Sequence, residues 1–333
     1  MAGREREADL ASLSLIRGAR HVVPAQIGTV GIRPPYGRSV DPLGLLGVPS
    51  NSSGKFDGVA HAPAVLRGAG LVEALAERVD VLDYGDVGLP EPSPGRDPTT
   101  HLIDPGGLET MITRVRDAVV RILEEGRFPL VIGGDCPLLL GCLLAARGDE
   151  TVGLLFVDGH EDAYPPDRST TGEAADTELA FALGIADMTW SSELAAAMPV
   201  VTPADVRILG ARDAATLREE RVPSIADRVD LVDDRGLIDD PRGATRRACS
   251  SLSAPWWFHL DLDVLSTDAL PAVDYRQPGG LGWDDLTSVA STAFDHDPLG
   301  WDVTIYNPDL DPERGHARKI VRFLAAVLAG GDE

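Results

Sequence analysis

The chain has 333 residues, of which 44% are hydrophobic, enough for a sizeable core in one large or two small domains. Its 30 Lys and Arg stand against 53 Asp and Glu, a formal net charge of -23 that repels phosphate backbones and anionic membrane surfaces. We therefore expect neither nucleic acid nor a membrane as a partner.

Residues 1–40 mix charged residues, proline and glycine without a clear period, and we expect an N-terminal extension there. The first ten residues, MAGREREADL, lack the basic-then-apolar order of a secretion signal. No apolar run in the sequence approaches the roughly 20 residues of a membrane-spanning helix. The expected location is the cytoplasm.

From residue 41 onward, short apolar runs alternate with longer segments whose apolar residues recur at three- and four-residue spacing. The expected strands are 43–48, 79–84, 128–134, 152–158, 206–211, 228–233, 256–264 and 301–307. Helical spacing is clearest at 62–78, 108–126 and 317–330. This alternation predicts one α/β domain over residues 41–333, with a central, mostly parallel sheet of about eight strands between two helical layers.

Acidic residues and histidines follow two of these apolar runs. Asp158, His160 and Asp162 come at alternate positions after Val157, so a continued extended backbone would point them to one side. A second cluster repeats the alternation with His259, Asp261 and Asp263. If the clusters meet beyond the carboxyl ends of the strands, they would suit one or two divalent ions that activate a water molecule as hydroxide.

The three cysteines lack the spacing of a disulfide framework or a structural zinc site. Cys142 and Cys249 lie in apolar helical contexts and are expected to be buried thiols. Cys136 differs, because it follows the expected strand 128–134 and would lie at the same edge of the sheet as the two acidic clusters.

The order of these motifs resembles the ureohydrolases, the arginase and agmatinase family of dimanganese amidinohydrolases. The similar stretches are residues 46–75, VIGGDC (131–136), VDGHED (157–162), ILGARD (208–213), HLDLDV (259–264) and IYNP (305–308). The resemblance implies an arginase-like three-layer αβα fold with an eight-stranded sheet, a small-molecule substrate, and a homo-oligomer that is usually a trimer or hexamer.

Carried over residue by residue, the family's metal ligands fall on Cys136, Asp158, His160, Asp162, Asp261 and Asp263. The family has a histidine where Cys136 stands. Because a thiolate is a soft ligand, the Mn2+ of the family could give way to Zn2+, Fe2+, Ni2+ or Co2+, one of two ions could be lost, or Cys136 does not ligate at all. His259 shares a strand face with Asp261 and is a candidate extra ligand or a residue that holds one.

The resemblance breaks down at the positions that select the substrate. Ile305 stands where the family has a glutamate that binds the guanidinium, and the position of its catalytic-loop histidine falls near Ala175. Ala215 stands where arginases have an aspartate that recognises the ammonium of arginine. Either the substrate is not a guanidine, or an acid replaces the missing glutamate, for which Glu173, Asp176 and Glu178 on the loop of residues 165–178 are the candidates. We expect catalytic roles for Asp162, Glu173 and Asp176, and a substrate pocket that includes Glu178 and Ile305.

These observations predict a metal-dependent hydrolase of a non-peptide carbon-nitrogen bond, acting on a guanidino or amidino compound other than arginine. One alternative is a single-metal amide hydrolase in which Asp158, His160 and Asp261 hold one Zn2+, as in deacetylase-like enzymes. Another is a non-catalytic ureohydrolase homologue. The number of ions bound per chain distinguishes the three.

Overall fold

The computed structural model describes residues 42–147, 151–186, 188–253 and 255–330. The extension predicted for residues 1–40 lies outside these ranges. None of the helices in the described ranges has the length and apolar content needed to cross a membrane.

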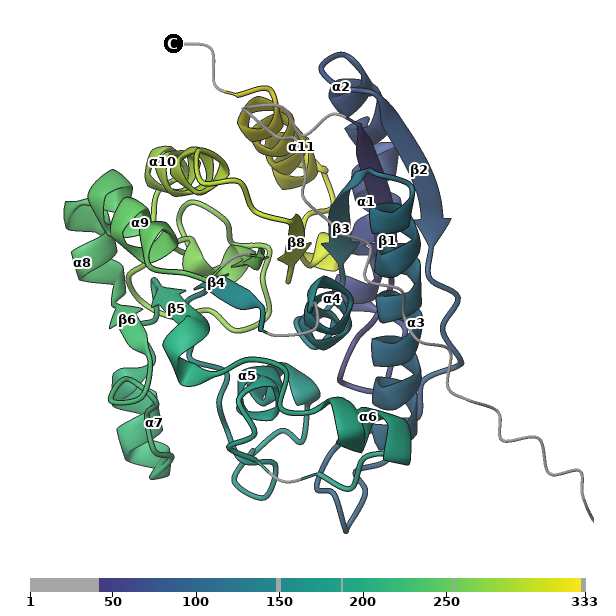
Figure 1. The fold of residues 1–333 in the computed structure, drawn as a ribbon, viewed down its shortest axis with the longest axis vertical. Helices are drawn as coiled ribbons and strands as arrows, with labels where there is room; N and C mark the ends of the chain where they lie inside the picture. The colour runs from purple at the N-terminus through teal and green to yellow at the C-terminus, as the bar shows by residue number, and fades with distance from the viewer. Residues whose placement is uncertain (1–41, 148–150, 187, 254, 331–333) are drawn as a thin grey trace, which may run out of the picture. The chain divides into compact units, whose positions relative to one another are not determined.

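Eight strands form one sheet in which every neighbouring pair is parallel, as predicted. The strands are β1 Leu43–Val48, β2 Val81–Asp86, β3 Phe128–Gly133, β4 Gly153–Val157, β5 Val206–Leu209, β6 Asp230–Val232, β7 Trp256–Asp261 and β8 Gly300–Thr304. Their order across the sheet is β2-β1-β3-β8-β7-β4-β5-β6 (Figure 1). The strands that precede the acidic clusters, β4 and β7, are therefore neighbours at the centre.

Helices cover both faces of the sheet, which makes a three-layer αβα arrangement. They are α1 Ala62–Gly68, α2 Leu71–Ala76, α3 Pro105–Glu124, α4 Leu138–Ala146, α5 Glu178–Ala182, α6 Ser192–Ala197, α7 Ala214–Glu220, α8 Asp234–Asp239, α9 Pro241–Ser250, α10 Trp283–Phe294 and α11 Gly315–Leu328. One apolar core joins the sheet to α1, α2, α9, α10 and α11, and a second joins its other face to α3, α4, α5 and α6 (Figure 1).

Side-chain alternation along the central strands decides which core each residue enters. On β7, Trp256, Phe258 and Leu260 enter the core of α10 and α11, whereas Trp257 enters that of α3 and α4. His259 lies on the same face as Trp257. The imidazole of His259 is thereby buried in the sheet beneath α4, where its ring nitrogens need hydrogen-bond partners.

Candidate metal centre

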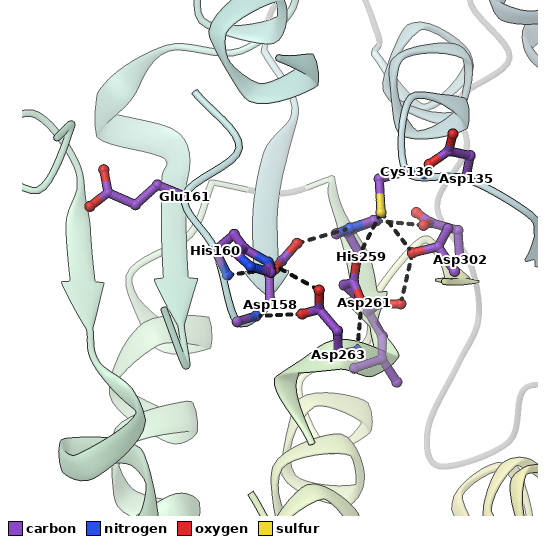
Figure 2. A network of polar contacts seen from close by, with 12 residues as sticks. Asp135, Cys136, Asp158, His160, Glu161, His259, Asp261, Asp263 and Asp302 are labelled. Atoms are coloured by element: carbon purple, nitrogen blue, oxygen red, sulfur yellow. Dashed lines mark hydrogen bonds and ion pairs between the residues drawn. The ribbon is translucent and has the colours of Figure 1, made fainter. Parts of the chain in front are cut away.

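The two acidic clusters lie side by side because β4 and β7 pair in parallel. Val157 at the end of β4 is opposite Leu260 on β7, so Asp158 and Asp261 both lie at the carboxyl edge. Cys136 reaches the same place from the loop after β3 (Figure 2). Potential ligand atoms of Cys136, Asp158, Asp162 and Asp261 lie within 4.8 Å of one another. The structure thus brings the predicted clusters together.

The first cluster converges through a loop, although the sequence suggested a continued strand. β4 ends at Val157, and the backbone then turns so that the amide of His160 donates to Asp158 Oδ1 at 2.7 Å. Asp162 has φ of 41°, in the left-handed region that non-glycine residues seldom occupy. This turn directs Asp162 back toward Asp158, which extended geometry would not do.

The second cluster also leaves its strand before its last acid. Asp261 ends β7, and a short 3-10 turn follows in which the amide of Asp263 donates to Asp261 Oδ1 at 2.6 Å. The Asp263 carboxylate lies 3.0 Å from His160 Nδ1 and accepts a hydrogen bond from the amide of Gly159 at 3.2 Å. Asp158, His160 and Asp263 form another group of possible ligands.

Electrostatics distinguishes Asp263 from the other acids of the centre. Burial alone would raise the pKa of Asp263, but His160 and Arg212 outweigh it and hold that pKa below its usual value. Burial raises the pKa of Asp158, Asp162 and Asp261, and the charges of neighbouring carboxylates raise each further. These three acids therefore share a buried space without enough positive charge from the protein.

Cys136 is buried with 1% exposure, and its sulfur lies among oxygen atoms. The thiol donates to Asp261 Oδ2 at 3.0 Å, and Sγ lies 3.1 Å from Thr304 Oγ1. Burial raises the pKa of the Cys136 thiol well above its usual value, and Asp261 raises it further. A cation that replaced the thiol proton would relieve both effects.

Several buried atoms at this centre lack hydrogen-bond partners within the described part of the chain. They are Asp158 Oδ2, His259 Nε2, and both carboxylate oxygens of Glu178. Leaving such groups unpaired costs about 1–3 kcal/mol each, and more when they are charged. Orphaned oxygen and nitrogen atoms beside a thiol and three further acids are a donor set that fits divalent metal ions.

A cavity of about 460 Å3 opens onto this centre. Asp162, Glu173, Asp176 and Ile305 line it, each from a position that the sequence had singled out. Glu178 does not line the cavity, since its side chain is fully buried beside Asp162. Its position is therefore behind the acidic cluster and differs from the pocket wall that the sequence suggested.

Comparison with known proteins agrees with this architecture. Residues 41–330 match the family described as the arginase family. The chain belongs to the arginase family. Human (Homo sapiens) Arginase-1 is 25% identical over 299 residues, which are 86% of this chain and 91% of that protein. N(omega)-hydroxy-L-arginine amidinohydrolase from Streptomyces lavendulae is 27% identical over 270 residues, or 79% of this chain and 92% of that protein.

The fold of solved relatives is also similar. Arginase from Bacillus cereus aligns with a TM-score of 0.74 at 26% identity, covering 87% of this chain and 99% of the other. These matches confirm the sequence-based assignment to a divergent member of the ureohydrolases. The family consists of metal-dependent amidinohydrolases, and this arginase-family chain is an enzyme of that class.

Sequence reasoning missed part of the site. Asp302, fully buried on β8, bonds to His259, and Arg212 donates to the backbone carbonyl of Asp263 at 2.6 Å. Tyr275 lines the cavity and donates to Glu173 Oε2 at 2.5 Å. A charged residue within the apolar strand 301–307 was the available signal for Asp302. Nothing in the sequence indicated that the loop of Tyr275 reaches the centre.

Proposed function

We propose that this enzyme hydrolyses a guanidino or amidino compound other than arginine. The convergence of acids from β4 and β7 at the floor of the cavity supports the hydrolytic chemistry. The proposed metal ligands are Cys136, Asp158, His160, Asp162, Asp261 and Asp263. Ile305, Ala175 and Ala215 stand where the resemblance implies residues that read arginine, which argues against arginine itself.

The proposed centre holds one or two divalent ions, Mn2+ by family or Zn2+, Fe2+, Ni2+ or Co2+ given Cys136. A divalent ion supplies Lewis acidity, which lowers the pKa of a water molecule and polarises the carbon-nitrogen group under attack. The residues named above would bind and position the ion. Asp158 belongs to each of the three ligand groups of the centre, so it would help to hold an ion in whichever of these groups bound one.

Glu173 and Asp176 are proposed to move protons at the leaving nitrogen. Asp176 accepts hydrogen bonds from Ser169 at 2.7 Å and Thr171 at 3.2 Å, and burial raises its pKa to about 6. A carboxyl group with this pKa can carry a proton near neutral pH. Both acids line the cavity and flank Ala175, where the family's loop histidine would lie.

The cavity wall favours a cationic substrate. Besides Glu173 and Asp176, the acids Glu220 and Asp274 line it, and the side chain of Asn307 donates to Asp274. Several carboxylates around one cavity attract a guanidinium or amidinium ion. Ile305 and Ala175 are the apolar residues of this wall, and Arg276 also lines it, so the cation is expected to meet the acids of residues 173–176.

The test is hydrolysis of a panel of guanidines, amidines and amides by metal-loaded protein, with bound metal measured in parallel. D176N should lower kcat by at least about tenfold, as expected for loss of an acid-base group. D205N is a matched control, because Asp205 also accepts from a threonine hydroxyl, at 2.7 Å, but does not line the cavity. Metal-loaded protein that hydrolyses nothing in the panel would contradict the proposal.

A single-metal amide hydrolase is the second candidate. Asp158, His160 and Asp263 form a complete group of three ligands, with Asp263 in the place that the sequence suggested for Asp261. One equivalent of metal per chain together with amidase activity would favour it over the dinuclear site. For either reading we propose a single catalytic domain over residues 41–333, a cytoplasmic location and, by resemblance, a trimer or hexamer.

A further inference from the structure

His259 lies in a row of paired residues across the centre of the sheet. Phe156 on β4 is its partner on one side and Asp302 on β8 is its partner on the other. The ring is fully buried and stacks on Phe156, with centroids 4.7 Å apart and an interplanar angle of 20°. Its position and its plane are therefore fixed by the sheet itself.

Asp302 fixes the orientation of the two ring nitrogens. His259 Nδ1 lies 2.5 Å from Asp302 Oδ2, and the indole of Trp257 donates to Asp302 Oδ1 at 2.6 Å. With both its oxygens engaged, Asp302 accepts the Nδ1 proton of His259. The other nitrogen, Nε2, is left to face the centre (Figure 2).

Nε2 of His259 has no hydrogen-bond partner within the described residues. Asp158 Oδ2 lies 3.9 Å from Nε2 and likewise has no hydrogen-bond partner among the described residues. A proton on Nε2 would be too far from that oxygen for a hydrogen bond. Because the ring lies between the carboxylates of Asp302 and Asp158, the surroundings nevertheless favour a positive charge.

A metal ion satisfies both atoms where a proton does not. Bonds from one ion to nitrogen and to oxygen are each about 2.0–2.2 Å long, so two such ligand atoms stand about 3.4 Å apart at a tetrahedral angle and up to about 4.2 Å apart when they lie opposite each other. The separation of 3.9 Å between His259 Nε2 and Asp158 Oδ2 lies between these two values. Cys136 Sγ completes the group, with all three ligand atoms within 4.8 Å of one another.

We propose that His259, held by Asp302, is the imidazole ligand of the ion on the Cys136 side of the centre. This inference rests on the metal centre of the proposed function. The imidazole that the resemblance places at position 136 is supplied instead from β7. Asp302 acts as a positioning residue, in the arrangement by which carboxylates commonly orient metal-binding histidines.

With His259 as a ligand, the two sides of the centre differ chemically. Nitrogen, sulfur and oxygen ligands from His259, Cys136 and Asp158 favour Zn2+ or Co2+ over Mn2+. The side formed by Asp158, His160 and Asp263 contains one nitrogen and carboxylate oxygens only, which Mn2+ accepts. Two ions of different kinds could therefore occupy one centre.

The test is titration of the full chain with Co2+, followed by absorption spectroscopy and by metal analysis after gel filtration. Wild type should show a thiolate-to-cobalt charge-transfer band from Cys136. The affinity for the Co2+ ion that gives this band should fall by at least about tenfold in H259Q and by about 10–100-fold in D302N. H316Q, a histidine change outside the metal-ligand groups, should bind as wild type does.

Zn2+-loaded wild type provides a measurement that needs no variant. X-ray absorption should give an average number of imidazole ligands per Zn2+ about twice that expected if His160 were the sole histidine ligand. Absence of bound metal in wild type would overturn the proposed function. Metal-loaded wild type with the lower imidazole number, or folded H259Q with unchanged binding of the band-forming ion, would overturn the role of His259 alone.

Discussion

Two buried glutamates should respond in opposite directions to the same substitution. Glu161 is 2% exposed, and both of its oxygens have donors, Ser224 Oγ at 2.7 Å and the amide of Ile225 at 2.6 Å. Glu178 is fully buried, yet neither of its oxygens has a donor among the described residues. Glutamine preserves the shape of each side chain and removes its charge.

E161Q should lower the free energy of unfolding by about 1–3 kcal/mol, because hydrogen bonds to a charged acceptor are replaced by weaker neutral ones. E178Q should raise that of the metal-free protein, because a neutral amide replaces a buried carboxylate whose charge is opposed by burial and by Asp158. The side-chain amide that E178Q introduces could also donate to Asp162, whose carboxylate otherwise repels Glu178.

The gain from E178Q should increase with pH. Burial and then the charge of Asp158 raise the pKa of Glu178 well above its usual value. A carboxyl group whose folded pKa is raised destabilises the fold as pH rises from its unfolded pKa toward its folded pKa. Over that window, the difference in stability between E178Q and wild type should grow by up to about 1.4 kcal/mol per pH unit.

Urea unfolding of EDTA-treated protein at several pH values, followed by the fluorescence of the five tryptophans, measures both effects. Saturating Zn2+ should reduce or reverse the advantage of E178Q, because a bound cation satisfies the acidic cluster. If E178Q destabilised the metal-free protein as much as E161Q does, the reasoning from unpaired oxygens would be refuted.

Three further outcomes are expected. Burial raises the pKa of Asp176 from 3.8 to about 6. At about 1.4 kcal/mol per pKa unit, the free energy of unfolding of D176N should rise relative to wild type by up to about 3 kcal/mol between about pH 4 and pH 6, with no further rise above pH 6. Urea unfolding curves at a series of pH values would measure this. C136H should raise the ratio of Mn2+ to Zn2+ affinity on the order of tenfold, about 1.4 kcal/mol, and competitive metal titration that found no change would exclude Cys136 as a ligand. Removing metal from protein saturated at about a hundredfold excess over Kd should cost about 2.7 kcal/mol of stability, measurable as a fall in Tm that added metal restores.

The spacing of apolar residues predicted the eight strands, because short apolar runs that alternate with helical segments are typical of buried parallel strands. It misjudged strand ends, as β4 stops at Val157 and β7 at Asp261. Those ends depend on contacts between segments far apart in sequence, such as the amide of Gly159 bonding to Asp263. The acids were identified correctly as a cluster even though the local geometry that gathers them was not.

The pairing of His259 with Asp302 could not be predicted from the spacing of residues in the sequence. His259 and Asp302 are separated by 43 positions and become partners only because β7 pairs with β8 in one particular register. A shift of one residue would turn Asp302 to the opposite face of the sheet. Sequence could place His259 on the face of Asp261, but its free nitrogen depends on this register.

Backbone strain at the centre indicates that its geometry is imposed by the surrounding fold. Asp162 and Ile305 both line the cavity, and both have positive φ, 41° and 68°. For a β-branched residue such as Ile305 this conformation costs about 1–3 kcal/mol. Each is held by a backbone hydrogen bond to a distant segment, Asp162 from Leu179 at 3.0 Å and Ile305 to Gly134 at 2.8 Å. The acids are thus arranged before any cation arrives, so binding carries little further cost of ordering them.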